Sequence, residues 1–518
     1  MKKIMVTMGL IFFCFGFLFP QEQKPEKISL TLNECLLKAL EDNLDISVEA
    51  FRPDISEFSI RAFREYFLPQ LSFGYENLSY NQPTNWYVEG DVYSRKTDSY
   101  SINLEQNIIT GGRVTLSLSN STTDTTRQLT IVNPTYSSNL ILNFTQPLLK
   151  NFGPKINKRE IKKAQNQRDI SVFGLKSTII QKVYDVEEAY WTLVLAIESL
   201  SVSESSLENS KEQLRRTKEA ARIGAKTAID VLSSETEVAN WESNIISARA
   251  QVESAEDRLR RIMNLPVDAS GLSRSILPLD RPLVEKKEIT FEEALKITLE
   301  ERPDLASNQK EVENSSIDVS YSKNQLLPQL DLGFFLFYPG QSGDLLIYEG
   351  DNPYTGNVID KIKGSRSDSL KDVFNFTYKN WQVRLDLTIP LGNIFSRASL
   401  AQARLQKEQK LLERERLNKS IYHEILEIFK ELKNNEKRME TSSRYRELME
   451  KKLNAEGERF RLGLVGSEWL FRYQRDFATA KTSEIRAIIE HKISVAKLEK
   501  ALGINLKTKN LRFRSYDF

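Results

Sequence analysis

The feature that most constrains the fold is an internal duplication of the chain. Leu68-Pro69-Gln70-Leu71 recurs as Leu327-Pro328-Gln329-Leu330. The same spacing superimposes other residues of the two halves, namely Thr31 on Thr290, Glu34 on Glu293 and Gly74 on Gly333. Farther along, Arg222-Ile223-Gly224 matches Arg461-Leu462-Gly463 at a shorter spacing. Because a repeated unit cannot be interpreted one motif at a time, the duplication predicts one architecture built from two copies of a supersecondary unit.

Length and charge narrow the class of protein. The chain has 518 residues, and 73 Lys and Arg nearly balance 71 Asp and Glu, which leaves a formal net charge of +2. No global basic field exists to recruit nucleic acid. The duplication predicts a first repeat over 28–266 and a second over 289–503, joined by a Pro-containing linker over 267–288 and followed by a tail over 504–518.

The N-terminus predicts export. Lys2 and Lys3 precede an apolar stretch over 4–19, which is short for a membrane span and is typical of a signal peptide ending near residue 21. An uncleaved anchor is the alternative. The two cysteines, Cys14 and Cys35, provide no disulfide within the exported chain, and the apolar residues on both sides of Cys14 disfavour lipid attachment there.

Each half begins with helices and continues with strands. Thr31 and Thr290 each start a short helix with a capping-box pattern, and a second helix runs to the Leu-Pro-Gln-Leu motif. Apolar residues then alternate with polar ones, which predicts strands with one apolar face: Leu71, Phe73 and Tyr75; Leu140, Leu142 and Phe144; Leu330, Leu332 and Phe334; Val383, Leu385 and Leu387. After the predicted signal peptide no apolar run approaches the roughly 20 residues of a transmembrane helix, so any membrane span is expected to use strands.

After Pro147 and Pro390 the apolar period changes from two to three and a half residues. The first stripe contains Ile179, Val183, Val186, Tyr190, Leu193, Ile197 and Leu200. Such a heptad seam predicts a coiled-coil helix, here on the order of 100 Å long at about 1.5 Å per residue. The chain reverses at Arg222-Ile223-Gly224, and the second half repeats the pattern over 396–461 and 467–502. We therefore expect two long antiparallel helical hairpins.

The strands cannot complete a membrane structure within one chain. Four strands are too few to close a barrel, and an open sheet edge in hydrocarbon leaves unpaired backbone groups that cost several kcal/mol each. We expect the edges to pair with other copies in a ring, with polar residues such as Arg384 and Asp386 facing a wet lumen. A further strand-like pair over 101–108 and 114–119 flanks Gly111-Gly112, and the sequence leaves open whether it joins the barrel or extends it outside the membrane.

This order of elements resembles the TolC family of outer membrane efflux channels. The resemblance is carried by the duplicated Leu-Pro-Gln-Leu, by the strand-to-helix junctions at Gln146-Pro147-Leu148-Leu149 and Pro390-Leu391-Gly392-Asn393, and by the two Arg-x-Gly turns. It implies a homotrimer with a twelve-strand barrel in outer membrane lipid and an α-helical barrel in the periplasm. It also implies partnership with a periplasmic adaptor and an inner membrane pump.

The resemblance assigns candidate sites to the hairpin turns. Arg222, Gly224, Arg461 and Gly463 are expected at a periplasmic tip, where they either dock the adaptor or serve only to reverse the chain. Channels of this family close their entrance with acidic residues after the turn glycine. Asp230 fits that position, whereas Trp469 and Arg472 occupy the matching positions of the second hairpin. We therefore expect a tip gate formed by Asp230, Trp469 and Arg472, with contacts between neighbouring hairpins.

No catalytic, cofactor or metal site is expected. His423-Glu424 lacks the second histidine of a zinc-protease motif, and Gly340-Gln341-Ser342-Gly343 lacks nucleophile-elbow spacing and is interpreted as an extracellular loop. Two functions remain: an exit channel for efflux or type I secretion, and a structural coiled-coil or adhesin-like surface protein. Strands at matched positions of both halves, each between helices, favour the channel.

Overall fold

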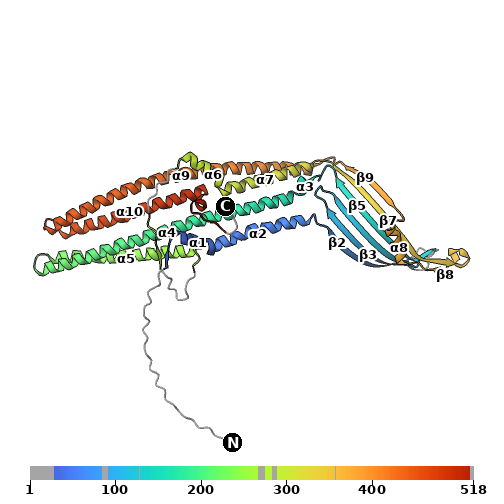
Figure 1. Ribbon diagram of the computed structural model, residues 1–518, viewed down its shortest axis with the longest axis horizontal. Coiled ribbons are helices and arrows are strands. Elements are labelled where there is room, and N and C mark those ends of the chain that lie inside the picture. The colour runs from blue at the N-terminus through green and yellow to red at the C-terminus, as the bar shows by residue number, and fades with distance from the viewer. Residues whose placement is uncertain are drawn as a thin grey trace, which may run out of the picture. The chain divides into compact units, whose positions relative to one another are not determined.

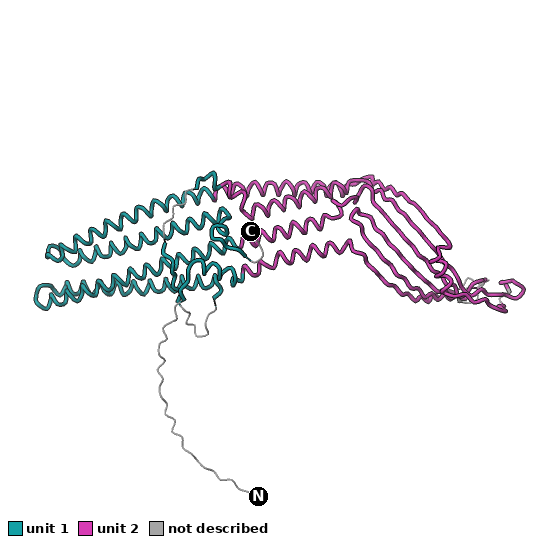
Figure 2. The backbone as a smooth tube through the Cα atoms, in the orientation of Figure 1, with its two compact units in different colours: residues 1–44, 179–294, 425–518 teal, residues 45–178, 295–424 magenta. Residues whose placement is uncertain are grey.

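A computed structural model describes residues 28–83, 92–127, 129–265, 275–282, 289–355 and 357–513 (Figure 1). The predicted signal peptide lies outside these ranges, as does most of the predicted linker over 267–288. The chain forms two compact units (Figure 2). Unit 1 comprises residues 1–44, 179–294 and 425–518, and unit 2 comprises residues 45–178 and 295–424. Each unit therefore takes segments from both sequence repeats.

Unit 2 contains an antiparallel sheet that is larger than expected. In pairing order its strands are β2 (Gln70–Pro83), β3 (Val92–Asn107), β4 (Arg113–Thr125), β5 (Val132–Pro147) and β7 (Gln329–Tyr348), with β8 (Val358–Ile362) and β9 (Asn380–Thr388) both paired to β7. β9 lies beside the first residues of β7 and β8 beside its last ones. The sheet thus contains more strands than the four per chain that a twelve-strand trimer requires, and the strand number of an assembled barrel stays a prediction. The pair around Gly111-Gly112 adds two long strands within the sheet, between β2 and β5.

The sheet has one apolar and one mainly polar face. Leu104, Leu116, Leu142 and Leu336 lie opposite one another on four consecutive strands, and residues paired in this way share a face. The neighbouring row, Glu105, Thr115 and Asn143, occupies the other face because successive side chains alternate. The polar face also carries Phe335 and Phe337, whose rings stack. The strand alternation expected from the sequence thus crosses the sheet from β2 to β9 in the half that lies next to the helices.

A short helix, α8 (Arg366–Phe374), packs on the apolar face near the end of the sheet that is remote from the helices. Ser369 Oγ lies 2.8 Å from Ser138 Oγ, and both side chains are fully buried. A Cβ at Gly340 would lie 1.9 Å from the Ser369 carbonyl oxygen, so this position requires glycine. The interpretation of Gly340-Gln341-Ser342-Gly343 as a loop is wrong. These residues belong to β7 and pair with β5, because long-range pairing overrides the local turn signal.

Helices follow the sheet at its other end. Unit 2 contains most of α2 (Leu44–Glu65), of α6 (Phe291–Glu301) and all of α3 (Pro154–Asn157) and α7 (Pro303–Asn324), together with the first turns of α4 (Arg159–Arg222) and α9 (Ile394–Arg461). Lys163 Nζ lies 2.9 Å from an Asp318 carboxylate oxygen, which ties the start of α4 to α7. Two short 3-10 turns, Glu349–Asp351 and Pro353–Thr355, separate β7 from β8.

Unit 1 contains the heptad seam and its hairpins. Ile179, Val186 and Leu193 are fully buried, which confirms the predicted seam in this part of α4. α5 (Ala228–Ile262) returns beside α4, and α10 (Ser467–Leu502) follows α9. Val202 of α4, Trp241 of α5 and Ala478 of α10 form a common apolar cluster, so the two hairpins pack together within unit 1.

Short elements complete unit 1. β1 (Ile28–Leu30) pairs in parallel with β6 (Ile276–Pro278), and α1 (Leu32–Asp42) begins with the predicted capping box, in which the Thr31 backbone N–H donates to Glu34 Oε2 at 2.7 Å. Burial raises the pKa of the Cys35 thiol to about 12, so this cysteine is a packed, protonated side chain. The predicted tail is partly folded, because α11 (Asn505–Thr508) buries Leu506.

Candidate functional site

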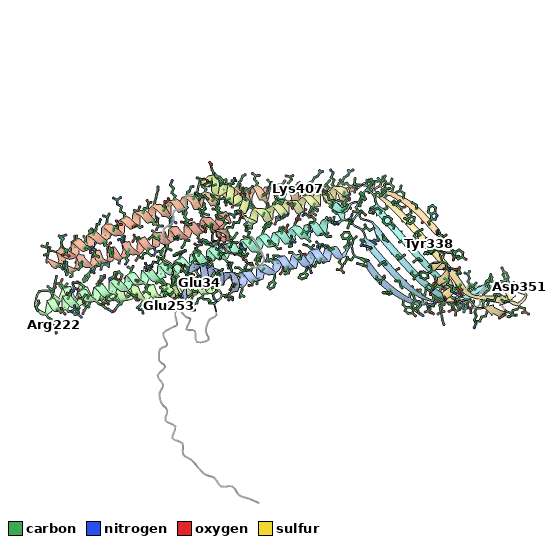
Figure 3. The ribbon with its side chains drawn as sticks, in the orientation of Figure 1. Glu34, Arg222, Glu253, Tyr338, Asp351 and Lys407 are labelled. Carbon is green, nitrogen blue, oxygen red and sulfur yellow. The ribbon has the colours of Figure 1, made fainter. Side chains whose placement is uncertain are left out.

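The two hairpin turns have the same backbone geometry. Arg222 ends α4 and Arg461 ends α9, and Figure 3 labels Arg222 at its turn. Gly224 has φ of 77° and Gly463 has φ of 75°, a left-handed conformation that side chains rarely adopt. A Cβ at either glycine would meet open space, so the backbone angle alone requires glycine. The structure thus supports the chain-reversal role of these glycines and leaves their surroundings accessible.

Asp230 joins the two hairpins. Its carboxylate accepts hydrogen bonds from the Thr227 backbone N–H at 3.0 Å and from the Thr227 hydroxyl at 2.7 Å, which caps α5. The other carboxylate oxygen lies 3.2 Å from Ser467 Oγ at the start of α10. The backbone hydrogen bond from Thr227, followed by the hydroxyl, lowers the pKa of Asp230, so the carboxylate is charged at neutral pH.

Trp469 and Arg472 form a separate cluster on α10. The Trp469 ring stacks on Tyr473, with 6.2 Å between ring centroids, and the Arg472 guanidinium lies 5.5 Å from the Trp469 centroid. Trp469 is 49% exposed. The structure therefore pairs Asp230 with Ser467 and Arg472 with Trp469. Contacts of Asp230, Trp469 and Arg472 with neighbouring chains stay a prediction.

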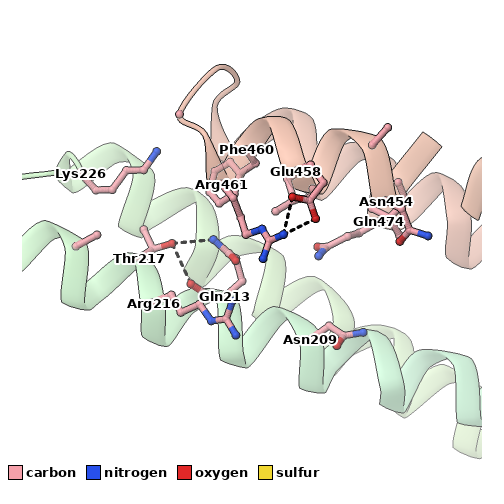
Figure 4. A pocket seen from close by; sticks show the side chains of 16 residues that line it. Asn209, Gln213, Arg216, Thr217, Lys226, Asn454, Glu458, Phe460, Arg461 and Gln474 are labelled. Carbon is pink, nitrogen blue, oxygen red and sulfur yellow. Dashed lines mark hydrogen bonds and ion pairs between the residues drawn. The ribbon is translucent and has the colours of Figure 1, made fainter. Parts of the chain in front are cut away.

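A groove of about 940 Å³, lined by both polar and apolar residues, lies between α4 and α9 near the turns (Figure 4). Its walls include Gln213 and Thr217 of α4 and Phe460 and Arg461 of α9. Lys226 Nζ lies 5.1 Å from the Phe460 ring centroid, and Arg461 pairs with Glu458 of its own helix. Arg216 and Lys226 on one wall and Arg461 on the other bring basic groups to the groove, and Arg216 and Arg461 pair with Glu212 and Glu458 of their own helices.

The two junction prolines lie where strands give way to helices. Pro147 is the last residue of β5, and the next backbone N–H, of Leu148, donates to the Leu330 carbonyl at 2.7 Å. Pro390 lies between the end of β9 and the start of α9. Because proline lacks an N–H group to donate, each proline lies where the pairing of its strand ends.

Comparison with known families decides the class of protein. The model of the family described as outer membrane efflux protein matches residues 112–265 and 294–504, which is more than half of the chain. The chain belongs to this outer membrane efflux protein family. No curated protein matches the chain. The match runs through both halves of the duplication and includes both hairpin turns.

Solved outer membrane channels share the fold of this efflux protein. The channel OprN is 17% identical, with a TM-score of 0.63 over 91% of this chain and 89% of that chain. Campylobacter jejuni CmeC is 15% identical, with a TM-score of 0.61 over 93% and 90%. The open state of Neisseria gonorrhoeae MtrE is 17% identical, with a TM-score of 0.60 over 91% and 88%. These likenesses confirm the resemblance to TolC-like channels that the sequence suggested.

The sequence did not predict one ion pair that joins the two hairpins of the efflux protein. Glu237 of α5 forms an ion pair with Arg475 of α10, and the Glu237 side chain is only 4% exposed. Glu237 follows Asp230 by one heptad, so both side chains lie on the same face of α5. That spacing could have identified Glu237, but Arg475 could be found only by knowing which helix packs against that face.

The structure offers no sign of metal or helical membrane sites in the residues it describes. Within those ranges, no three histidine, cysteine or carboxylate side chains gather as metal ligands do. None of the described helices has the length and apolarity needed to cross a membrane. His491 is buried on α10, where burial lowers its pKa and favours the neutral ring.

Proposed function

We propose that this efflux protein is a homotrimeric exit channel of the outer membrane. In this proposal it receives substrates from a periplasmic adaptor and an inner membrane pump and releases them outside the cell. Family membership supports an efflux channel, and the likeness in fold to OprN, CmeC and MtrE supports a pore formed by β-strands.

The sheet is the observation that carries the proposal. Every residue of β2 and of β9 is exposed, and within the described sheet each of these strands pairs on one side only. Long exposed edges of this kind invite pairing with another chain. In hydrocarbon an open edge leaves backbone groups unsatisfied, so a ring of copies is the arrangement that fits.

The two faces of the sheet fit lipid on one side and water on the other. Apolar side chains such as Phe73 and Leu385 are 73% and 62% exposed. On the polar face, Arg384 and Asp386 form an ion pair at 2.6 Å, and Arg113 and Glu105 form another at 3.2 Å. A globular adhesin-like head would bury the apolar face, so the structural alternative is not favoured.

The hairpin turns are the proposed adaptor-docking and gating region. The groove between Gln213, Thr217, Phe460 and Arg461 is open and includes Lys226, and a helical tip with carboxylates would complement its basic groups. Asp230 and Ser467, with Glu237 and Arg475, hold the two hairpins together in one chain. Loosening these contacts is proposed to open the entrance.

The decisive experiment combines assembly with conduction. The protein should be recovered from outer membrane fractions, run as a trimer by mass measurement in detergent, and conduct ions in planar bilayers. A stable monomer or an inner membrane location would overturn the proposal. For the gate, Asp230→Arg, which breaks the contact with Ser467, and Arg472→Asp, which changes the predicted contact with a neighbouring hairpin, should each raise single-channel conductance. Unchanged conductance in both variants would remove the gating role while leaving the channel intact.

A further inference from the structure

The first half of the chain supplies four long strands to the sheet and the second half two. β3 and β4 form a hairpin inserted between β2 and β5, paired to β2 over its whole length and to β5 over most of β4. The hairpin is therefore part of one continuous wall. It is not a flap on either face, since both its strands have sheet neighbours on both sides.

The β3–β4 hairpin reaches the helical end of the sheet. Its turn closes with Gly111 N–H donating to the Ile108 carbonyl at 2.8 Å, and Gly153 N–H, just before α3, donates to the Thr110 carbonyl at 2.9 Å. A Cβ at Gly111 would lie 2.3 Å from the Asn151 carbonyl oxygen. This close packing places the turn at the start of the helices, so the hairpin spans the same height as β2 and β5.

The hairpin also carries the same binary pattern as its neighbours. Ile102 lies opposite Phe73 on β2 and Leu118 on β4, and Leu118 lies opposite Leu140 on β5. The apolar face therefore continues without a break across β3 and β4. A hairpin that only extended the barrel into water would have no reason to present this apolar band.

Six long strands per chain determine how copies can join. Because six is even, β2 runs away from the helices and β9 runs back toward them, so β2 of one chain and β9 of the next would pair antiparallel. With the homotrimer of the proposed function, on which this inference rests, we propose that the assembled pore is an eighteen-strand barrel.

Such a barrel changes what the exit can pass. At a strand spacing near 4.8 Å and a tilt near 40°, eighteen strands enclose a ring roughly 36 Å across between backbones, against roughly 24 Å for twelve. Barrels of this strand number hold an open aqueous lumen. The exit then accommodates bulky or polymeric cargo, and selection by size falls to the hairpin turns.

Distances between spin labels in the assembled protein test the strand number. Asn143 lies on the polar face of β5, and an Asn143→Cys variant adds a thiol there, whereas Cys35, the cysteine within the described residues, is buried. Three equivalent labels in an eighteen-strand ring should be separated by roughly 31 Å between backbones, against roughly 21 Å in a twelve-strand ring. The parent protein, labelled in parallel, provides the background.

A deletion provides the matched comparison. Removing residues 92–125 deletes β3 and β4 and leaves β2 to connect to β5, which runs antiparallel to it. With the same Asn143→Cys label, the full-length trimer should give distances about 1.5 times those of the deletion variant. If the deletion variant does not assemble, the full-length distance alone decides.

The outcomes separate this inference from the proposed function. A full-length trimer with the shorter distance overturns the eighteen-strand barrel, and so does a conducting dimer, whose two chains supply only twelve strands. Either result leaves the channel function standing. A protein that neither assembles nor conducts overturns the proposed function itself.

Discussion

The sheet of unit 2 and the hairpins of unit 1 differ in how much of their apolar side chains is exposed. In the sheet they stay exposed within one chain, as Phe73 and Leu385 show. In the hairpins they are buried within the same chain, as Val186 and Leu193 show, and α5 caps its own start through Thr227. In the proposed channel the sheet therefore depends on lipid and on other copies for its stability. The hairpins fold within one chain and leave polar groups for recognition.

The largest effect is expected from a substitution in the buried seam of the hairpins. Val186 is fully buried, so Val186→Asp places an unpaired carboxylate in the seam. We expect a loss of about 3–5 kcal/mol in the free energy of unfolding and little assembled protein, measured by thermal unfolding and by trimer yield. Ser201→Asp, at an exposed position of the same helix, is the control. Normal assembly of Val186→Asp would show that the heptad seam is wrongly assigned.

In the proposed channel the sheet responds differently to substitution, because its apolar face contacts lipid. Leu142 and Asn143 are neighbours on β5 with opposite faces. Leu142→Arg should cost about 2–4 kcal/mol per chain in the membrane and reduce the trimer in outer membrane fractions. Asn143→Arg should be tolerated. Equal trimer levels in both variants would contradict the assignment of lipid and lumen faces.

The contact between the hairpins is expected to be asymmetric. Glu237 is nearly buried, whereas the Arg475 side chain is 45% exposed. Arg475→Ala leaves a buried carboxylate without its partner and should cost about 1–3 kcal/mol, while Glu237→Gln should cost less because Arg475 can return to water. Thermal unfolding measures the stability and single-channel recording measures the opening. A larger loss of unfolding free energy in Glu237→Gln than in Arg475→Ala would contradict this asymmetry.

The smallest effect concerns pH at Asp230. Its folded pKa lies below the ordinary 3.8, mainly through the Thr227 backbone hydrogen bond. A carboxyl with a lowered folded pKa stabilises fully above its unfolded pKa, and this contribution disappears as pH falls through the folded value. The stability difference between the parent and Asp230→Asn should therefore be constant near pH 6 and shrink below about pH 4. A difference that is independent of pH would show that the charge of Asp230 does not contribute.

Several parts of the fold could be predicted because their causes are local. Thr31 and Glu34 form the capping box that their spacing predicted, and so do Thr290 and Glu293. The heptad stripe in α4 predicted a buried seam, and Gly224 and Gly463 predicted the reversals. Each of these features depends on residues within a few positions of one another.

The candidate site was predicted only in part, because its contacts join residues that are far apart in the sequence. Asp230 was identified from its distance to Gly224, but its partner Ser467 lies on the other hairpin, as does Arg475, the partner of Glu237. Sequence spacing says which residues share a helix face. It does not say which other helix packs against that face.

The duplication, the period of each element, the polar and apolar faces of the strands and the positions of the turns can all be derived from the amino-acid sequence. These properties follow from backbone geometry and side-chain chemistry over short stretches of chain. Three features became known from the three-dimensional fold: β3 and β4 lie between β2 and β5, Gly340 belongs to a strand, and α8 packs over it through Ser369. Strand order and such close contacts arise from pairing between distant segments, and many different pairings are compatible with the same local pattern.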